Sequence, residues 1–157
     1  TPPKESEKQV VPLDWDQRHT VNATVSFGSP SKWNIGILGR YSTGQPYTPT
    51  NPGSQLTTQF ENSAQKPHTF VFDLNMYRVV KLGNIQFRVF TKIFNVFDRL
   101  NQVSVYSSTG SSENPYRSIA ERKILSGNPN LSLHEINLKP NYYGKPRKIL
   151  IGIKIAF

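Results

Sequence analysis

Cysteine is absent from this 157-residue chain, which excludes disulfide bonds and cysteine-ligated metal sites. The sequence also lacks any run of about 18 or more apolar residues, and this excludes a transmembrane helix. Sustained helical periodicity is missing, so we expect no long helix. Acidic residues are scarce, since 10 Asp and Glu stand against 19 Lys and Arg for a net charge of +9. The length fits one domain.

Catalytic and cofactor motifs are also missing. His19, His68 and His134 lie far apart in the sequence and lack the spacing of metal ligands. Asp14 and Asp16 could begin a calcium loop, but the glycine and glutamate positions of such a loop are absent. No glycine-rich phosphate loop or nucleophile elbow is present. We therefore predict a protein that is not an enzyme and uses no cofactor.

What the chain does contain is alternation. Five segments repeat apolar residues with a period of two, the pattern of a β-strand with two unlike faces. The predicted strands are residues 19–27, 33–42, 70–80, 84–94 and 149–157. The last is the clearest, because every odd position is apolar: Ile149, Ile151, Ile153, Ile155 and Phe157. Strands of about 9–11 residues can cross a bilayer when tilted, although a soluble sheet shows the same alternation.

The connections between these segments alternate in length. Residues 28–32 and 81–83 are tight turns, whereas about 43–69 and 98–146 are long loops. Transmembrane barrels have short turns at one end and long loops at the other, while soluble sandwiches have loops of mixed length at both ends. If consecutive strands run in opposite directions, both tight turns and the C-terminal end of the last strand lie on the same side of the predicted sheet. Val103 to Tyr106 is a candidate short strand within the second long loop.

The strand charges obey the same alternation. Five basic residues occupy the face opposite the apolar one, and we predict that they point into a wet interior: Arg40, Arg88, Lys92, Lys148 and Lys154. A charge on a lipid-facing position near the bilayer midplane would cost about 2–4 kcal/mol. Arg78 shares the apolar parity, but it lies near a turn and can reach the interface by extending its side chain.

Four short motifs follow one another along the chain. They are residues 16–19 (Asp-Gln-Arg-His), 42–48 (Ser-Thr-Gly-Gln-Pro-Tyr-Thr), 95–99 (Asn-Val-Phe-Asp-Arg) and 146–152 (Pro-Arg-Lys-Ile-Leu-Ile-Gly). Each resembles a motif of the TonB-dependent outer-membrane receptors, and the four occur in that family's order. The resemblance extends over most of residues 13–157.

The resemblance implies an all-β fold. This chain would be an antiparallel meander of about five long strands, the C-terminal part of a 22-stranded transmembrane β-barrel. Residues 1–18 would be the remnant of an extracellular loop, and residues 19–157 the barrel segment, with extracellular loops at about 43–69 and 98–146. The N-terminal plug and the remaining strands would belong to a longer parent chain, which makes this chain a fragment or a truncated product.

The resemblance also implies a function. The intact protein would carry out energy-coupled uptake of a siderophore, cobalamin or oligosaccharide across the outer membrane of a Gram-negative bacterium. The implied partners are outer-membrane lipid, the plug domain, the remaining strands and a TonB-type energy transducer, with no nucleic acid. The barrel-assembly machinery would recognise the terminal strand through Ile149, Ile151, Ile153, Ile155 and Phe157.

Several roles stay open at the level of sequence. The inward basic residues either pair with acidic groups of the plug or contact the ligand. Tyr116, Arg117, Tyr142 and Tyr143 either contact the ligand from the large loop or pack that loop. Two other functions remain: a small outer-membrane barrel with a structural or adhesion role, and a soluble basic β-domain that binds polyanions.

Overall fold

A computed structural model describes residues 10–50, 60–117, 119–127, 137 and 139–156. Phe157, the last member of the predicted terminal signal, lies outside the described residues, as do His134 and residues 1–9 of the predicted loop remnant. Parts of both predicted extracellular loops, residues 51–59, 118, 128–136 and 138, also lie outside them.

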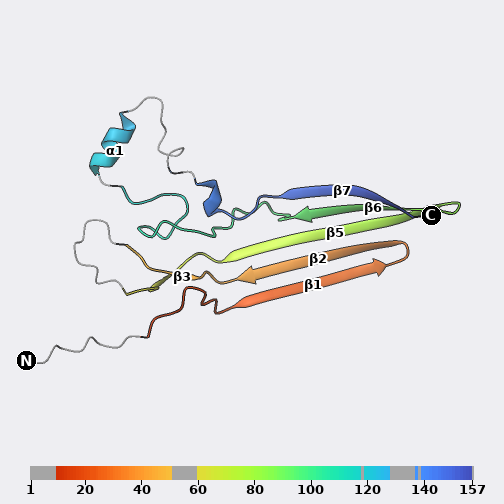
Figure 1. The fold of residues 1–157 in the computed structure, drawn as a ribbon, viewed down its shortest axis with the longest axis horizontal. Coiled ribbons are helices and arrows are strands. Elements are labelled where there is room, and N and C mark those ends of the chain that lie inside the picture. The colour runs from red at the N-terminus through yellow and green to blue at the C-terminus, as the bar shows by residue number, and fades with distance from the viewer. Residues whose placement is uncertain (1–9, 51–59, 118, 128–136, 138, 157) are drawn as a thin grey trace, which may run out of the picture.

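Five long strands form one antiparallel meander, which confirms the predicted all-β sheet (Figure 1). The strands lie in the order β1-β2-β5-β6-β7, so that each pairs with its neighbour in sequence among the five. Their bounds are Thr20–Ser29, Trp33–Ser42, Thr69–Leu82, Ile85–Phe94 and Lys148–Ala156. Each predicted strand is present, and its bounds differ from the prediction by at most two residues.

The two ends of the sheet differ. Pro30 and Gly83 belong to tight turns that join β1 to β2 and β5 to β6, at the end where β7 also finishes (Figure 1). Gly83 has a φ of +60°, a conformation that glycine adopts without strain. We call this the turn end. Both long connections lie at the opposite end, here called the loop end, as the alternation of loop lengths predicts.

The long connections contain short elements. β3 (Pro46–Tyr47) pairs with β4 (Ala64–Gln65), and the second connection contains α1 (Ile119–Ser126) and the 3-10 turn η1 (Pro140–Tyr142). The candidate strand at Val103 to Tyr106 is wrong, because only the isolated bridge between Gln102 and Tyr143 forms nearby. The sequence analysis did not predict α1, because a helix of eight residues is too short to show a sustained period.

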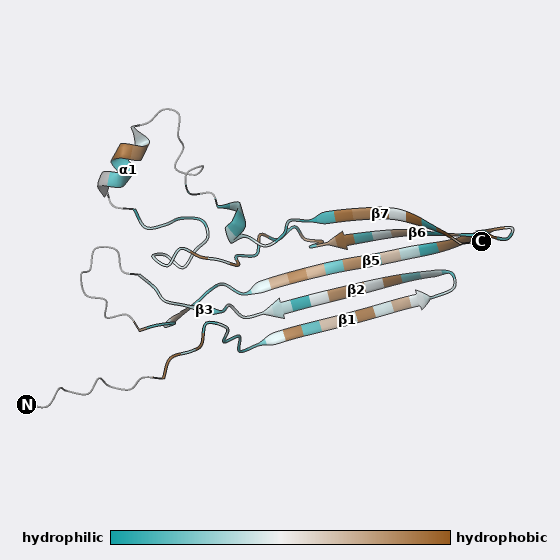
Figure 2. Cartoon of the chain, in the orientation of Figure 1, coloured by the Kyte–Doolittle hydropathy of each residue, from teal (hydrophilic) through white to brown (hydrophobic). Residues whose placement is uncertain are grey.

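Neither face of the sheet is covered by the rest of the described chain. Among the described residues Pro46 is the one apolar side chain that is buried, and it lies in the first long connection rather than in the five-stranded sheet. The buried polar side chains of the described residues are those of Asn62, Asn95, Asn101, Ser112 and Asn137. Hydrophobic and hydrophilic bands alternate along the strands in Figure 2. The sheet therefore has two exposed faces of different chemistry.

Gly44 provides a test of the packing at the loop end. It is buried, and a Cβ atom at this position would overlap the backbone carbonyl of Lys66. We expect Gly44→Ala to lower the free energy of unfolding by about 1–3 kcal/mol in equilibrium urea unfolding. Gly36→Ala is the matched control, since its Cβ would lie 3.8 Å from the nearest heavy atom. Equal effects of the two substitutions would contradict this packing.

Candidate functional site

The strand registers gather the apolar parity of all five strands on one side of the sheet. Ile37 lies opposite both Val25 and Leu74, and this row continues through Ile93 to Ile149. We define the apolar face as the odd positions of β1, β2, β6 and β7 with the even positions of β5. The remaining strand positions form the polar face. Because directly paired residues place their side chains on the same side, each face is continuous across the sheet.

The apolar face is extensively exposed. Ile151, Ile153 and Val25 have relative exposures of 75%, 62% and 58%. Arg78 is the single charged residue on this face within the described strands. Contiguous exposed apolar surface of this extent marks a site of contact with a membrane or a partner protein.

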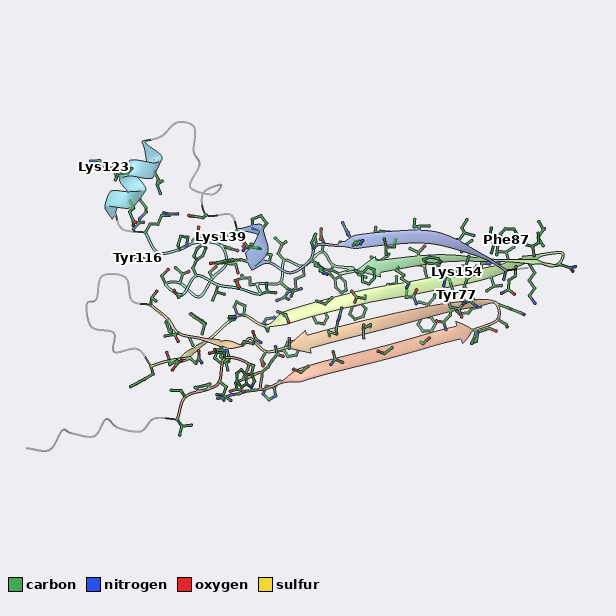
Figure 3. All side chains as sticks on the ribbon, viewed as in Figure 1. Tyr77, Phe87, Tyr116, Lys123, Lys139 and Lys154 are labelled. Atoms are coloured by element: carbon green, nitrogen blue, oxygen red, sulfur yellow. The ribbon has the colours of Figure 1, made fainter. Side chains whose placement is uncertain are left out.

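Aromatic side chains mark both ends of the apolar face. At the turn end the rings of Phe27 and Trp33 meet edge to face, with centroids 6.4 Å apart, and Phe87 lies at the same end in Figure 3. At the loop end the ring of Phe70 stacks on that of Phe97 at 6.4 Å. Aromatic residues therefore lie at two levels of the apolar face, with aliphatic residues between them.

All five predicted interior basic residues lie on the polar face, where one of them has an acidic partner. Arg40 Nη2 donates a 2.6 Å hydrogen bond to Asp73 Oδ2. The other carboxylate oxygen of Asp73 accepts the backbone N–H of Asn95 at 2.9 Å. The Asp73 side chain is only 13% exposed. Arg40 therefore already has an acidic partner within this chain.

The other four predicted interior cations lack such partners. Arg88 and Lys154 lie directly opposite each other on β6 and β7, and like charges in this position are destabilising. The Arg88 guanidinium carbon lies 4.6 Å from the centre of the Tyr77 ring. Lys92 faces Asn75 and Leu150, and Lys148 pairs with Phe94. None of these four cations forms an ion pair with a described carboxylate, so an acidic group would complement this face.

The 95–99 motif fastens the end of β6 to the start of β7. Asn95 Nδ2 donates to the carbonyl oxygens of Arg99 and Lys145, both at 3.1 Å. Asp98 Oδ1 accepts the backbone N–H of Arg147 at 2.8 Å. Both Asn95 and Asp98 have φ near +50°, a region that Asn and Asp tolerate better than most residues. The motif thus connects segments about fifty residues apart, which is a structural role.

Asn101 likewise holds the start of β5 through hydrogen bonds to the backbone. Its Oδ1 accepts the backbone N–H of Phe70 at 2.8 Å, and its Nδ2 donates to the Phe70 carbonyl oxygen at 2.9 Å. This buried amide replaces the backbone of a neighbouring strand where β6 has already ended. Sequence reasoning did not single out Asn101 as a functional residue, although it lies only two residues after the 95–99 motif.

The first two motifs also meet at the loop end. The backbone N–H of Thr43 donates to the carbonyl oxygen of His19 at 2.9 Å, and Gln17 Nε2 donates to the Thr43 carbonyl oxygen at 3.0 Å. Buried Asn62 donates to Asp14 Oδ1 at 2.7 Å. All four motifs therefore contribute to one hydrogen-bonded end of the sheet.

The four predicted ligand-contact residues divide into two pairs. Tyr116 and Arg117 line a hollow of about 360 Å³, and Arg117 donates from Nε and Nη2 to Asn137 Oδ1 at 3.1 and 2.8 Å. The Tyr142 ring lies 5.0 Å from that of Tyr106.

In the second pair, Tyr142 belongs to a packed aromatic cluster, whereas Tyr143 forms the isolated β-bridge with Gln102. Lys139 Nζ lies 4.9 and 5.0 Å from the centres of the Tyr106 and Tyr142 rings, and Figure 3 shows Lys139 at the loop end. Tyr106 Oη also donates to the carbonyl oxygen of Asn137 at 3.0 Å. These contacts of Tyr142 pack the large loop, whereas Tyr116 is 53% exposed. Sequence reasoning missed Asn137 and Lys139, because no strand period or motif includes them, and it named Tyr106 only as the end of the candidate strand at Val103 to Tyr106.

In the residues that the structure places, no group of three or more His, Cys, Asp or Glu side chains could hold a metal ion. No helix in the described part of the chain combines the length and apolar character that crossing a bilayer demands. Comparisons with protein-family models, with curated proteins and with solved structures find no match for this chain. The chemistry of the two faces and of the loop end is therefore the basis for assigning a function.

The Asn101 contacts predict that a single substitution at this position lowers the free energy of unfolding strongly. Asn101→Ala would leave the N–H and the carbonyl of Phe70 without partners, and we expect a loss of about 2–3 kcal/mol in the free energy of unfolding. Asn75→Ala is the control, because Asn75 is exposed on the polar face, and it should change stability by less than about 0.5 kcal/mol. A similar loss in both variants would contradict the role of Asn101.

The environment of Tyr143 predicts that the free energy of unfolding depends on pH. Burial raises the pKa of its phenol above the usual value of 10.0, and the charges of Glu113 and Tyr106 raise it further. The folded chain then keeps a proton that the unfolded chain loses, so stability should fall as pH rises through and beyond about 10. Tyr143→Phe should remove part of that fall in urea unfolding measured from pH 9 to 11. A variant with the unchanged wild-type pH dependence would contradict this expectation.

Proposed function

We propose that this chain is the C-terminal part of the barrel of a TonB-dependent outer-membrane receptor. Its apolar face contacts lipid, and its polar face looks into the barrel, toward the plug. The parent protein carries out energy-coupled uptake of a ligand of the siderophore, cobalamin or oligosaccharide class in a Gram-negative bacterium. The proposal includes no catalytic step and no cofactor.

The observation that carries this proposal is the continuous, exposed apolar face. In a soluble domain this face would be packed against another layer, since a large aliphatic side chain gains about 1.5–3 kcal/mol from full burial. Here Ile149, Ile151, Ile153 and Ile155 on β7 are all more than half exposed. Acyl chains provide the same apolar surroundings without a second protein layer. The strand lengths, 9 to 14 residues, are sufficient to cross a bilayer.

The edges of the sheet support a larger assembly. β1 and β7 are the outer strands, so each has one side without a partner strand in the described chain. Unpaired backbone groups are not tolerated in lipid, and the smallest single-chain transmembrane barrels have eight strands. The remaining strands of the parent barrel would pair with both edges.

The orientation follows from the two ends of the sheet. The turn end would face the periplasm and the loop end the outside, in agreement with the loop asymmetry of outer-membrane barrels. Acidic groups of the plug would pair with Arg88, Lys92, Lys148 and Lys154, which lack acidic partners in the described chain. The barrel-assembly machinery would read the apolar residues of β7 together with Phe157.

Site-directed spin labelling tests the two faces. The intact protein is labelled at Ile37 or Ile153 on the apolar face and at Leu38 or Lys154 on the polar face, then reconstituted in vesicles. We expect labels at 37 and 153 to collide preferentially with oxygen, and labels at 38 and 154 with a water-soluble nickel complex. Leu38 is the decisive control, because it is as apolar as Ile37 but lies on the opposite face.

Water accessibility at all four positions would contradict a membrane location. That result, together with a steep salt dependence of binding to a polyanion, would favour the soluble basic β-domain. Oxygen accessibility at 37 and 153 in a protein of only eight or so strands would instead favour the small structural or adhesion barrel.

A further inference from the structure

A groove indents the apolar face near the turn end. Its volume is about 670 Å³, and the apolar-face residues that line it are Trp33, Ile35, Met76, Arg78, Val89 and Thr91. Two neighbouring cross-strand rows supply them. Trp33, Arg78 and Val89 form the row nearer the turn end, and Ile35, Met76 and Thr91 form the next. Thr91 is smaller than its neighbours Met76 and Ile151, so the surface is lower at this position.

Two hydrogen-bond donors of the apolar face lie side by side at the turn end of this groove, which Lys32 of the turn between β1 and β2 also lines. Arg78 and Trp33 are direct cross-strand partners. Arg78 is exposed, and it makes no ion pair with any carboxylate that the structure describes. The Trp33 side chain is 42% exposed, and its indole N–H takes part in no hydrogen bond to a described residue. Both donors are therefore available to an acceptor from outside the chain.

The groove is consequently divided by chemistry. Its turn end offers a guanidinium and an indole N–H, whereas Ile35 and Met76 make its floor aliphatic toward the middle of the sheet. The guanidinium fork matches the oxygen atoms of a phosphate in two parallel hydrogen bonds. Trp is enriched where the membrane interface begins, because its ring is apolar and its N–H is polar.

We propose that this groove binds one anionic phospholipid of the membrane leaflet at the turn end. The phosphodiester accepts hydrogen bonds from Arg78 and Trp33, and one acyl chain lies along Ile35, Met76 and Thr91. This inference rests on the proposed function, since it requires the apolar face to be in the membrane. It gives Arg78 a role: the one charge on the apolar face is stabilised by the charge of a bound lipid.

The complementarity favours a lipid over an acidic protein. The described apolar face carries no acidic residue, so the field around Arg78 has a single sign. An acidic peptide would match the guanidinium but would leave the aliphatic floor uncovered. A phospholipid satisfies both parts, because its charge and its hydrocarbon are joined in the same order as the two ends of the groove.

Quenching of Trp33 fluorescence tests this site. The intact protein is reconstituted in phosphatidylcholine vesicles that contain either brominated phosphatidylglycerol or brominated phosphatidylcholine at the same mole fraction. The Trp33 signal is isolated by subtracting the emission of the Trp33→Phe variant. We expect the association of phosphatidylglycerol at Trp33 to exceed that of phosphatidylcholine about fivefold, the effect of roughly one cationic contact near a membrane surface.

Two variants separate a site from general charge attraction. Arg78→Gln should reduce the preference to about one, whereas Lys81→Gln should preserve it. Lys81 carries the same charge at the same end of β5 but lies on the polar face. Each variant is paired with its own Trp33→Phe double variant.

The possible outcomes distinguish a failure of the lipid site from a failure of the proposed membrane location. Equal quenching by the two brominated lipids, or equal effects of the two variants, would overturn the lipid site and leave the membrane-facing sheet intact. Absence of quenching by either lipid would place Trp33 outside the hydrocarbon and would contradict the proposed function itself. Preferential quenching that only Arg78→Gln removes would support the site.

Discussion

The cross-strand register is the constraint on which the rest of this structure depends. Side chains alternate across a strand, so a slip of one residue would exchange the two faces of that strand. In β7 such a slip would move Lys154 to the apolar face and Ile153 to the polar face. The contacts at the two ends oppose it. The tight turn at Gly83 fixes β5 against β6, and at the loop end Asn101 holds Phe70 while Asp98 holds Arg147.

The loop-end contacts explain how a sheet with two exposed faces can have a defined structure. The buried polar side chains of the described chain lie outside the long strands, and three of them, Asn62, Asn95 and Asn101, hydrogen-bond segments that meet at the loop end. The faces are thereby left free to match their surroundings. On the apolar face these surroundings would be acyl chains, and on the polar face acidic groups opposite Arg88 and Lys154. Stability and function would then depend on different parts of the molecule.

Much of the sheet could be predicted from the sequence, because alternation with a period of two reports directly on strands. The five strands, their order and the difference between the two ends follow from it. The loops could not be predicted in this way. α1 is too short to establish a period, and the apolar residues at Val103 to Tyr106 suggested a strand that lacks a partner strand. The contacts of Asn101, Asn137 and Lys139 depend on tertiary placement, which no local pattern encodes. The family resemblance located the loop-end motifs, and the structure shows what Asn95 and Asp98 do there.

The central claim is that one face of the sheet contacts hydrocarbon and the other contacts water. Solid-state NMR of the unmodified protein in lipid bilayers measures this directly, by magnetisation transfer to individual residues from acyl chains or from water. Along β7, the account predicts transfer from acyl chains to Ile149, Ile151, Ile153 and Ile155, and from water to Leu150 and Lys154. Transfer from water to the four isoleucines, with no difference between odd and even positions, would contradict it.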